Sequence, residues 1–147
     1  MGGSIWGRFG FSDVLTVFLA MDSYVELYKG GIIPLEQFAG MKKDNDILVR
    51  LIVKKSPCSI VYTSMRNQRT DFPVIACAVA CVNGEYRAAV GARPGRAILL
   101  RSEKSENFAA FVAENVPTEG NVRGSAAYRT HLVKVLTERS LKELGGM

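Results

Sequence analysis

The clearest regular pattern in the sequence is a long apolar run in the middle of the chain. Residues Phe72–Val82 are apolar at both alternating positions, which is typical of a central strand with two covered faces. Asn83-Gly84 follows, and this dipeptide is the strongest two-residue signal for a hairpin turn. The return segment Glu85–Ala92 alternates, with its larger apolar side chains on one face and Arg87 on the other. We therefore predict a β-hairpin that is half buried.

The segments around this hairpin predict a sheet followed by helices. We expect Ser59–Met65 to pair as a third strand and Ala97–Leu100 to be an extension of the sheet. Glu103–Val116 and Ser125–Leu144 carry apolar residues at helical spacing. Strands followed by helices, without alternation of the two, favour an α+β fold. The prediction is a three-stranded antiparallel sheet packed on a helical bundle.

The first part of the chain predicts shorter elements. Ser12 can cap a helix whose body, Val14–Met21, is apolar nearly all round and should be buried on most sides. We predict a strand at Tyr24–Tyr28, which a hairpin turn at Lys29–Gly31 joins to a short strand at Ile32–Ile33. A helical turn at Pro34–Phe38 and a last strand at Ile47–Val53 are predicted to follow.

A polar connector separates these two groups of elements. Lys54–Pro57 combines two lysines with Ser-Pro, which is typical of a solvated linker. We therefore predict two lobes, residues 1–55 and 56–147.

Composition and charge narrow the class of protein. The 147 residues are 48% apolar and 22% charged, as in a globular protein, and no apolar run approaches the roughly 20 residues that span a bilayer. No secretory or transit signal is visible, which favours the cytoplasm. The net charge of +5 is spread evenly, with nine basic and seven acidic residues up to Gly84 and ten and seven after it. This even spread argues against nucleic-acid binding, which favours a basic stripe.

Few residues suggest bond-making chemistry. The three cysteines, Cys58, Cys77 and Cys81, form no CxxC pair, and we expect them to be reduced core residues rather than metal ligands. His131 lies in the predicted last helix, where packing or capping is the expected role. We therefore predict no catalytic residue and no metal site.

The glycine-rich opening is a candidate binding segment. Gly2, Gly3, Gly7 and Gly10 lie within ten residues, a density that predicts a loop. Bare backbone beside the helix start at Ser12 could approach phosphate or ribityl oxygens closely. A flexible N-terminal leader is the alternative reading.

A polar turn is the second candidate. The run Arg66–Asp71 is rich in hydrogen-bond donors and directly precedes the apolar strand. A solvated hairpin connection is the alternative reading.

Several segments, taken in order, resemble one family. They are Gly2-Gly3-Ser4-Ile5, Ser12-Asp13, Val17–Leu27, Pro34–Phe38, Arg66–Pro73 and Gly124–Leu132. Together they are similar to the C-terminal half of the FAD-binding (medium) subunit of the molybdenum hydroxylases, the family of xanthine dehydrogenase and aerobic carbon monoxide dehydrogenase. The resemblance implies that residues 1–55 are the second half of the FAD-binding domain and that residues 56–147 are the C-terminal domain of that subunit. The resemblance covers almost the whole chain.

The resemblance implies a cofactor, partners and binding residues. It implies an FAD-carrying subunit that passes electrons from iron–sulfur clusters to NAD or another acceptor, beside an iron–sulfur subunit and a molybdenum-cofactor subunit. The FAD-binding residues that it implies are Gly2, Gly3, Ser4, Ile5, Ser12, Asp13 and Asp71. Ser4 stands where the family more commonly has Asn.

The family has an additional N-terminal half, with another glycine-rich loop, before the position that corresponds to Gly2. We therefore expect this chain to be a fragment of the subunit or one product of a split gene, with an incomplete FAD site. We also expect the apolar helix after Ser12, without that cover, to self-associate or to expose a sticky patch. Two rival functions remain: a flavin-free module that docks to partner subunits, and a small nucleic-acid-binding protein.

Overall fold

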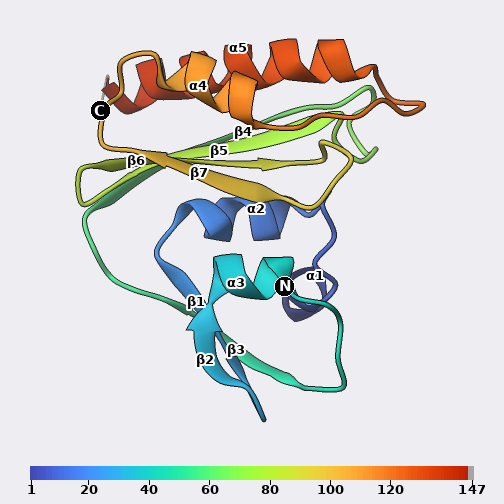
Figure 1. The fold of residues 1–147 in the computed structure, drawn as a ribbon, viewed down its shortest axis with the longest axis vertical. Coiled ribbons are helices and arrows are strands. Elements are labelled where there is room, and N and C mark those ends of the chain that lie inside the picture. The colour runs from blue at the N-terminus through green and yellow to red at the C-terminus, as the bar shows by residue number, and fades with distance from the viewer. Residues whose placement is uncertain (146–147) are drawn as a thin grey trace.

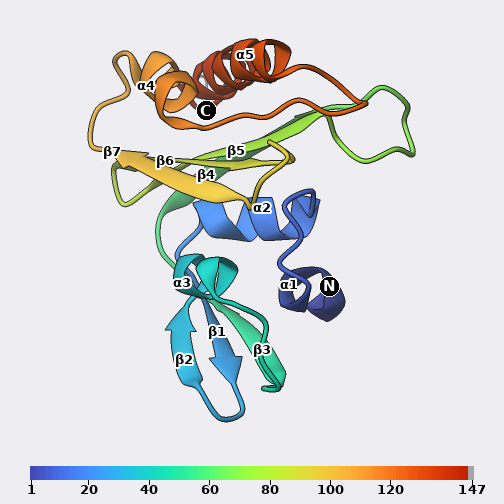
Figure 2. The same ribbon diagram turned by 45° about the vertical axis from the view of Figure 1, so that its right-hand side comes forward.

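The computed structural model describes residues 1–145 and has the predicted α+β class. Its layers follow one another along the long axis of the molecule (Figure 1). Two C-terminal helices cover one face of a four-stranded sheet, and a helix from the N-terminal part covers the other. A three-stranded sheet lies beyond that helix. The turned view in Figure 2 shows the same order.

The larger sheet is antiparallel, with the strand order β4-β5-β6-β7. Its strands are β4 (Cys58–Met65), β5 (Ile75–Val82), β6 (Glu85–Gly91) and β7 (Ile98–Ser102). β7 is a fourth strand, formed by the segment that we expected to extend the sheet. The predicted hairpin turn is confirmed, because Asn83 and Gly84 have φ values of 52° and 86°. These left-handed conformations suit an Asn-Gly turn between twisted strands.

Both faces of the hairpin are buried, so the prediction of a half-buried hairpin is wrong. On β5, Cys77 and Val79 face the C-terminal helices, whereas Ala78 and Ala80 face the N-terminal part. Ala89 of β6 is fully buried on that second face. The small alanine side chains allow a helix to pack closely on the sheet. The alternating pattern alone does not reveal this second cover.

The two C-terminal helices are α4 (Phe108–Asn115) and α5 (Ala126–Gly145). α5 begins one residue after the predicted Ser125, whereas α4 begins five residues after the predicted Glu103. β7 runs to Ser102, and Asn107 takes a left-handed φ of 57°, so the helix cannot start earlier. His131 lies on the exposed side of α5, and the expected packing role is wrong.

The smaller sheet has the order β2-β1-β3, formed by β1 (Ser23–Leu27), β2 (Gly31–Pro34) and β3 (Leu48–Val53). The predicted elements of this region are confirmed, including the helical turn, which is α3 (Leu35–Gly40). Lys54–Pro57 lies between β3 and β4 and forms no regular element. Arg101 of β7 donates two hydrogen bonds to Glu36 of α3, at 3.1 and 2.5 Å, and so links the larger sheet to that helix.

Helix α2 (Asp13–Ala20) lies between the two sheets. As predicted, Ser12 caps it, because the Ser12 hydroxyl accepts a hydrogen bond from the Leu15 amide at 3.1 Å. No residue of α2 is exposed, since the larger sheet covers one side and α3 packs on the other. The predicted exposed patch is therefore absent from α2, whose apolar side chains are buried or half-buried, and self-association stays a prediction.

The glycine-rich opening is not a loop but begins with a short helix, α1 (Gly2–Trp6). Ile5 is only 1% exposed, and the Trp6 ring lies 6.0 Å from the ring of Phe38. These contacts offset the poor helix propensity of glycine. Within residues 1–145, no helix has the length and apolar character needed to cross a membrane.

The cysteines differ in exposure. Cys77 is buried in the core, as predicted, but Cys58 is exposed, so its prediction as a core residue is wrong. Burial raises the pKa of Cys77 to about 11 and also raises the pKa of Cys58.

We expect a thiol reagent at about pH 8 to label Cys58 in the folded protein and to leave Cys77 unmodified until urea is added. Peptide mass spectrometry after timed labelling would measure both rates. Equal labelling of Cys58 and Cys77 in the folded protein would contradict the burial of Cys77.

Candidate functional site

A cavity of about 300 Å³ lies beside the start of α2. It is lined by Ser4 of α1, by the turn before α2 and by the polar turn after β4. Four of the seven residues that the resemblance implied line this cavity, namely Ser4, Ser12, Asp13 and Asp71. The other three do not line it: Ile5 is buried in the core, and Gly2 and Gly3 lie on the exposed first turn of α1.

Asp13 is the centre of the polar contacts at this cavity. Its two carboxylate oxygens accept hydrogen bonds from Tyr62 Oη and from an Arg66 guanidinium nitrogen, each at 2.5 Å. Burial raises the pKa of Tyr62 above its usual value, and the hydrogen bond to Asp13 acts in the same direction. Tyr62 is therefore a neutral donor at physiological pH. Asp13 keeps free lone pairs for a ligand, because a carboxylate accepts about four hydrogen bonds.

The polar turn Arg66–Asp71 is tied to two other segments. Arg66 donates to the carboxylate of Asp13 in α2 at 2.5 Å, and Arg123 of the loop before α5 donates to the Asp71 carboxylate at 2.8 Å. The hydrogen bond from Arg123 holds the pKa of Asp71 below its usual value. The turn is thus fixed at the cavity rather than being only a solvated connection.

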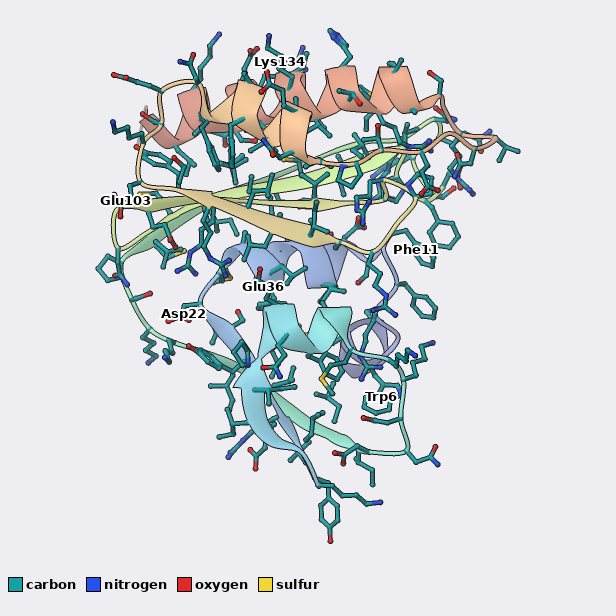
Figure 3. The ribbon with its side chains drawn as sticks, viewed as in Figure 1. Trp6, Phe11, Asp22, Glu36, Glu103 and Lys134 are labelled. Carbon is teal, nitrogen blue, oxygen red and sulfur yellow. The ribbon has the colours of Figure 1, made fainter. Side chains whose placement is uncertain are left out.

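Three phenylalanines form a wall beside the polar groups. The rings of Phe9 and Phe11 stack with centroids 5.2 Å apart, and those of Phe11 and Phe72 are 4.3 Å apart. Their exposed fractions are 45%, 40% and 51%, although aromatic side chains of this size are usually buried in the core. Figure 3 shows Phe11 at the side of the molecule, with Trp6 of α1 below it on the same side. This wall offers a surface on which a planar ring could stack.

A larger cavity, of about 610 Å³, adjoins the first. Both cavities are lined by Phe9, Phe11, Phe72 and Pro73, so they form one groove across the aromatic wall. We call this the phenylalanine groove. Its far side is lined by the loop between β6 and β7 and by Asn121 and Arg123 of the loop before α5.

The sequence interpretation missed the phenylalanine groove, because its rings come from two distant segments. The signal in the sequence was Phe9 and Phe11, two large apolar residues in a segment that was expected to be a loop. Phe72 was placed at the start of the predicted buried strand, but β5 begins only at Ile75. Among residues 1–145 no cluster of three or more histidine, cysteine or acidic side chains could hold a metal ion. The groove has ring surfaces, carboxylates and guanidinium groups, which suits ligand binding rather than bond-making.

Comparison with known proteins gives matches in structure alone. No family model matches the sequence, and no curated protein matches it. Carbon monoxide dehydrogenase from Hydrogenophaga pseudoflava, in a form that lacks the Mo-pyranopterin moiety of the molybdenum cofactor, matches with a TM-score of 0.79 and 19% identity over 96% of this chain. Quinoline 2-oxidoreductase from Pseudomonas putida 86 matches with a TM-score of 0.74 and 16% identity over 97%. Reconstituted CO dehydrogenase from Oligotropha carboxidovorans matches with 0.75 and 16% over 96%.

The likeness establishes the fold. The match covers 58% of the Hydrogenophaga chain and 59% of each of the other two, so this chain spans less than two thirds of their length. The TM-scores establish that the backbone fold is shared. Sequence identities this low do not carry the activities of those enzymes to this chain.

Proposed function

We propose that this chain is part of the FAD-binding, electron-transfer subunit of a molybdenum hydroxylase of the xanthine dehydrogenase and carbon monoxide dehydrogenase type. One observation carries the proposal. Ser4, Ser12, Asp13 and Asp71 come from separate segments, were implied by the resemblance, and line one cavity beside an aromatic wall. The shared fold with enzymes of this chemistry supports it.

The residues of the groove fit FAD in chemical character. The rings of Phe9, Phe11 and Phe72 suit a planar ring system. The carboxylates of Asp13 and Asp71 and the hydroxyl of Ser4 suit ribityl hydroxyl groups and ring N–H groups. The two cavities, of about 300 and 610 Å³, are within the usual size range of ligand pockets.

In this proposal FAD supplies the redox chemistry, and the protein binds and orients it. Asp13 is held in place by Tyr62 and Arg66, so its carboxylate is already oriented before a ligand arrives. The phenylalanine wall would exclude water from one side of the ligand. Electrons would come from an iron–sulfur subunit and leave to NAD or another acceptor, and substrate hydroxylation would take place in a molybdenum-cofactor subunit.

The rival functions find less support. A flavin-free docking module would be favoured by a disordered opening segment, but the segment forms α1 and packs into the core. A nucleic-acid-binding protein would expose a stripe of unpaired basic side chains. Here four arginines are ion-paired to acidic side chains, namely Arg50, Arg66, Arg101 and Arg123.

Titration of the purified chain with FAD tests the proposal. We expect saturable but weak binding, with a dissociation constant on the order of 10 µM, because this chain covers only 58% of the length of the matched Hydrogenophaga chain. Asp13→Asn should weaken binding about tenfold, the expected effect of losing a hydrogen bond to a charged group. FAD fluorescence quenching would measure both values.

Asp22→Asn is the matched control, because Asp22 lies on the opposite side of the molecule from Phe11 (Figure 3) and does not line the groove. It should leave the affinity for FAD unchanged. The absence of saturable binding, or an equal loss in both variants, would overturn the proposal. A stoichiometric complex of submicromolar affinity would overturn the expectation that the site is incomplete.

A further inference from the structure

The side chain of Arg8 is buried without a hydrogen-bond partner. Arg8 is only 6% exposed, and none of its three guanidinium nitrogens makes a hydrogen bond within residues 1–145. The guanidinium lies 3.9 Å from the ring centroid of Phe38 and 5.0 Å from that of Trp6. A buried cation is costly unless it is compensated, and cation–π contacts offset only part of that cost.

The charges around Arg8 do not cancel. Burial lowers the pKa of Arg8. The negative charge of Asp44 raises this pKa, and the positive charge of Arg96 lowers it. Asp44 lies beyond ion-pair distance of Arg8. Arg8 therefore leaves uncompensated positive charge at the wall of the larger cavity, which it lines.

The rest of the larger cavity is also basic. Its lining contains Arg8, Arg96 and Arg123 but no acidic residue. Arg123 is neutralised by Asp71, whereas Arg96 is exposed and donates only to the carbonyl oxygen of Gly40 within the described residues. Two arginines without a carboxylate partner thus lie at one apolar cavity with phenylalanine rings at its edge.

We propose that the larger cavity binds a phosphate-bearing anion, with Arg96 as the direct donor and Arg8 as a fixed positive charge behind it. The guanidinium group suits phosphate because it offers several donors in one plane. Arg8 acts through its charge, since its nitrogen atoms are covered. This inference differs from the expectation that the Gly2-Gly3 backbone holds the phosphate, and it does not rest on the flavin proposal, because an inorganic anion is enough to test it.

Calorimetric titration with sodium pyrophosphate provides the test. We expect the wild-type chain to bind pyrophosphate with a dissociation constant on the order of 1 mM at low salt, and more weakly as salt is added. Arg96→Gln should weaken binding about tenfold. The control is Arg139→Gln, which removes the same charge from an exposed position on α5, on the other face of the larger sheet, and should change the affinity less than about twofold.

Equal effects of the two variants, or no binding of pyrophosphate by the wild-type chain, would overturn the inference. Competition by FAD and by inorganic phosphate then distinguishes the sources of the anion. If FAD displaces pyrophosphate, the cavity takes the diphosphate of a dinucleotide. If only inorganic phosphate does so, the cavity is a separate anion site.

The two proposals can fail separately. FAD binding that depends on Asp13, together with pyrophosphate binding that ignores Arg96, would leave the flavin proposal standing and remove the anion site. Pyrophosphate binding that depends on Arg96, without any binding of FAD, would do the reverse. Circular dichroism of each variant would confirm that it is folded.

Discussion

Replacing Arg129 with methionine is expected to lower the free energy of unfolding by about 3–5 kcal/mol, because several buried hydrogen bonds lose a charged donor and each is worth about 1.5–3 kcal/mol. Arg129 is 1% exposed and, among residues 1–145, is the largest fully buried side chain. It donates to the carbonyl oxygens of Val74, Glu119 and Gly124 at 2.8, 2.6 and 2.6 Å. A fourth bond, of 2.6 Å, goes to the Asn121 side chain. Methionine fills a similar volume but cannot donate, so all four acceptors lose this donor. Gly124 O and Asn121 Oδ1 keep a bond from the backbone amides of Asn121 and Arg123.

Urea denaturation of the wild-type chain and two variants would measure the effect. Arg139→Met is the matched control, because Arg139 lies on the same helix with its side chain exposed. It should change stability by less than about 0.5 kcal/mol, as surface substitutions usually do. A loss of less than about 1 kcal/mol in Arg129→Met would mean that water replaces the lost donors.

The same substitution should affect the groove. Arg129 joins the start of β5 to the loop before α5, and that loop carries Asn121 and Arg123 to the larger cavity. Without Arg129, Arg123 would be less well held against Asp71, and the polar turn would be held less firmly beside Asp13. The stability of the fold and the shape of the phenylalanine groove therefore both depend on Arg129.

The sequence predicted most elements, because local patterns determine them. Asn83-Gly84 set the hairpin, and Ser12 marked the start of α2, since both act through contacts with near neighbours. Errors arose where distant residues decide the outcome. The second buried face of β6 depends on α2, which lies far from it in the sequence. α1 forms because Ile5 and Trp6 pack against the core, despite the two glycines at its start.

The candidate site was only partly predictable for the same reason. The resemblance pointed to Ser4, Ser12, Asp13 and Asp71, and the fold brings these four residues together. The phenylalanine groove and the unpartnered Arg8 arise from chain crossings that no local pattern encodes. The density of glycines predicted a backbone segment that contacts a ligand. Gly10 instead allows the opening segment to pass close to the backbone of Gly95.

Gly10→Ala is expected to destabilise the protein by about 3 kcal/mol, the upper range for forcing an extra methyl into a packed site. A Cβ atom at Gly10 would lie 2.0 Å from the Gly95 carbonyl oxygen, which belongs to the backbone and cannot rotate away. The Gly10 carbonyl oxygen also accepts a hydrogen bond from the Ala92 amide, and this bond fixes the opening segment to β6. The clash should push that segment, with α1, away from the larger sheet. Because Trp6 is the only tryptophan, its fluorescence would report the movement of the segment, and a urea titration would measure the loss of stability.

Gly3→Ala is the control: a Cβ there meets nothing within 4 Å, and alanine should stabilise α1 by about 0.5–1 kcal/mol. Equal stability and unchanged Trp6 emission in both variants would show that the crossing at Gly10 does not hold the groove together.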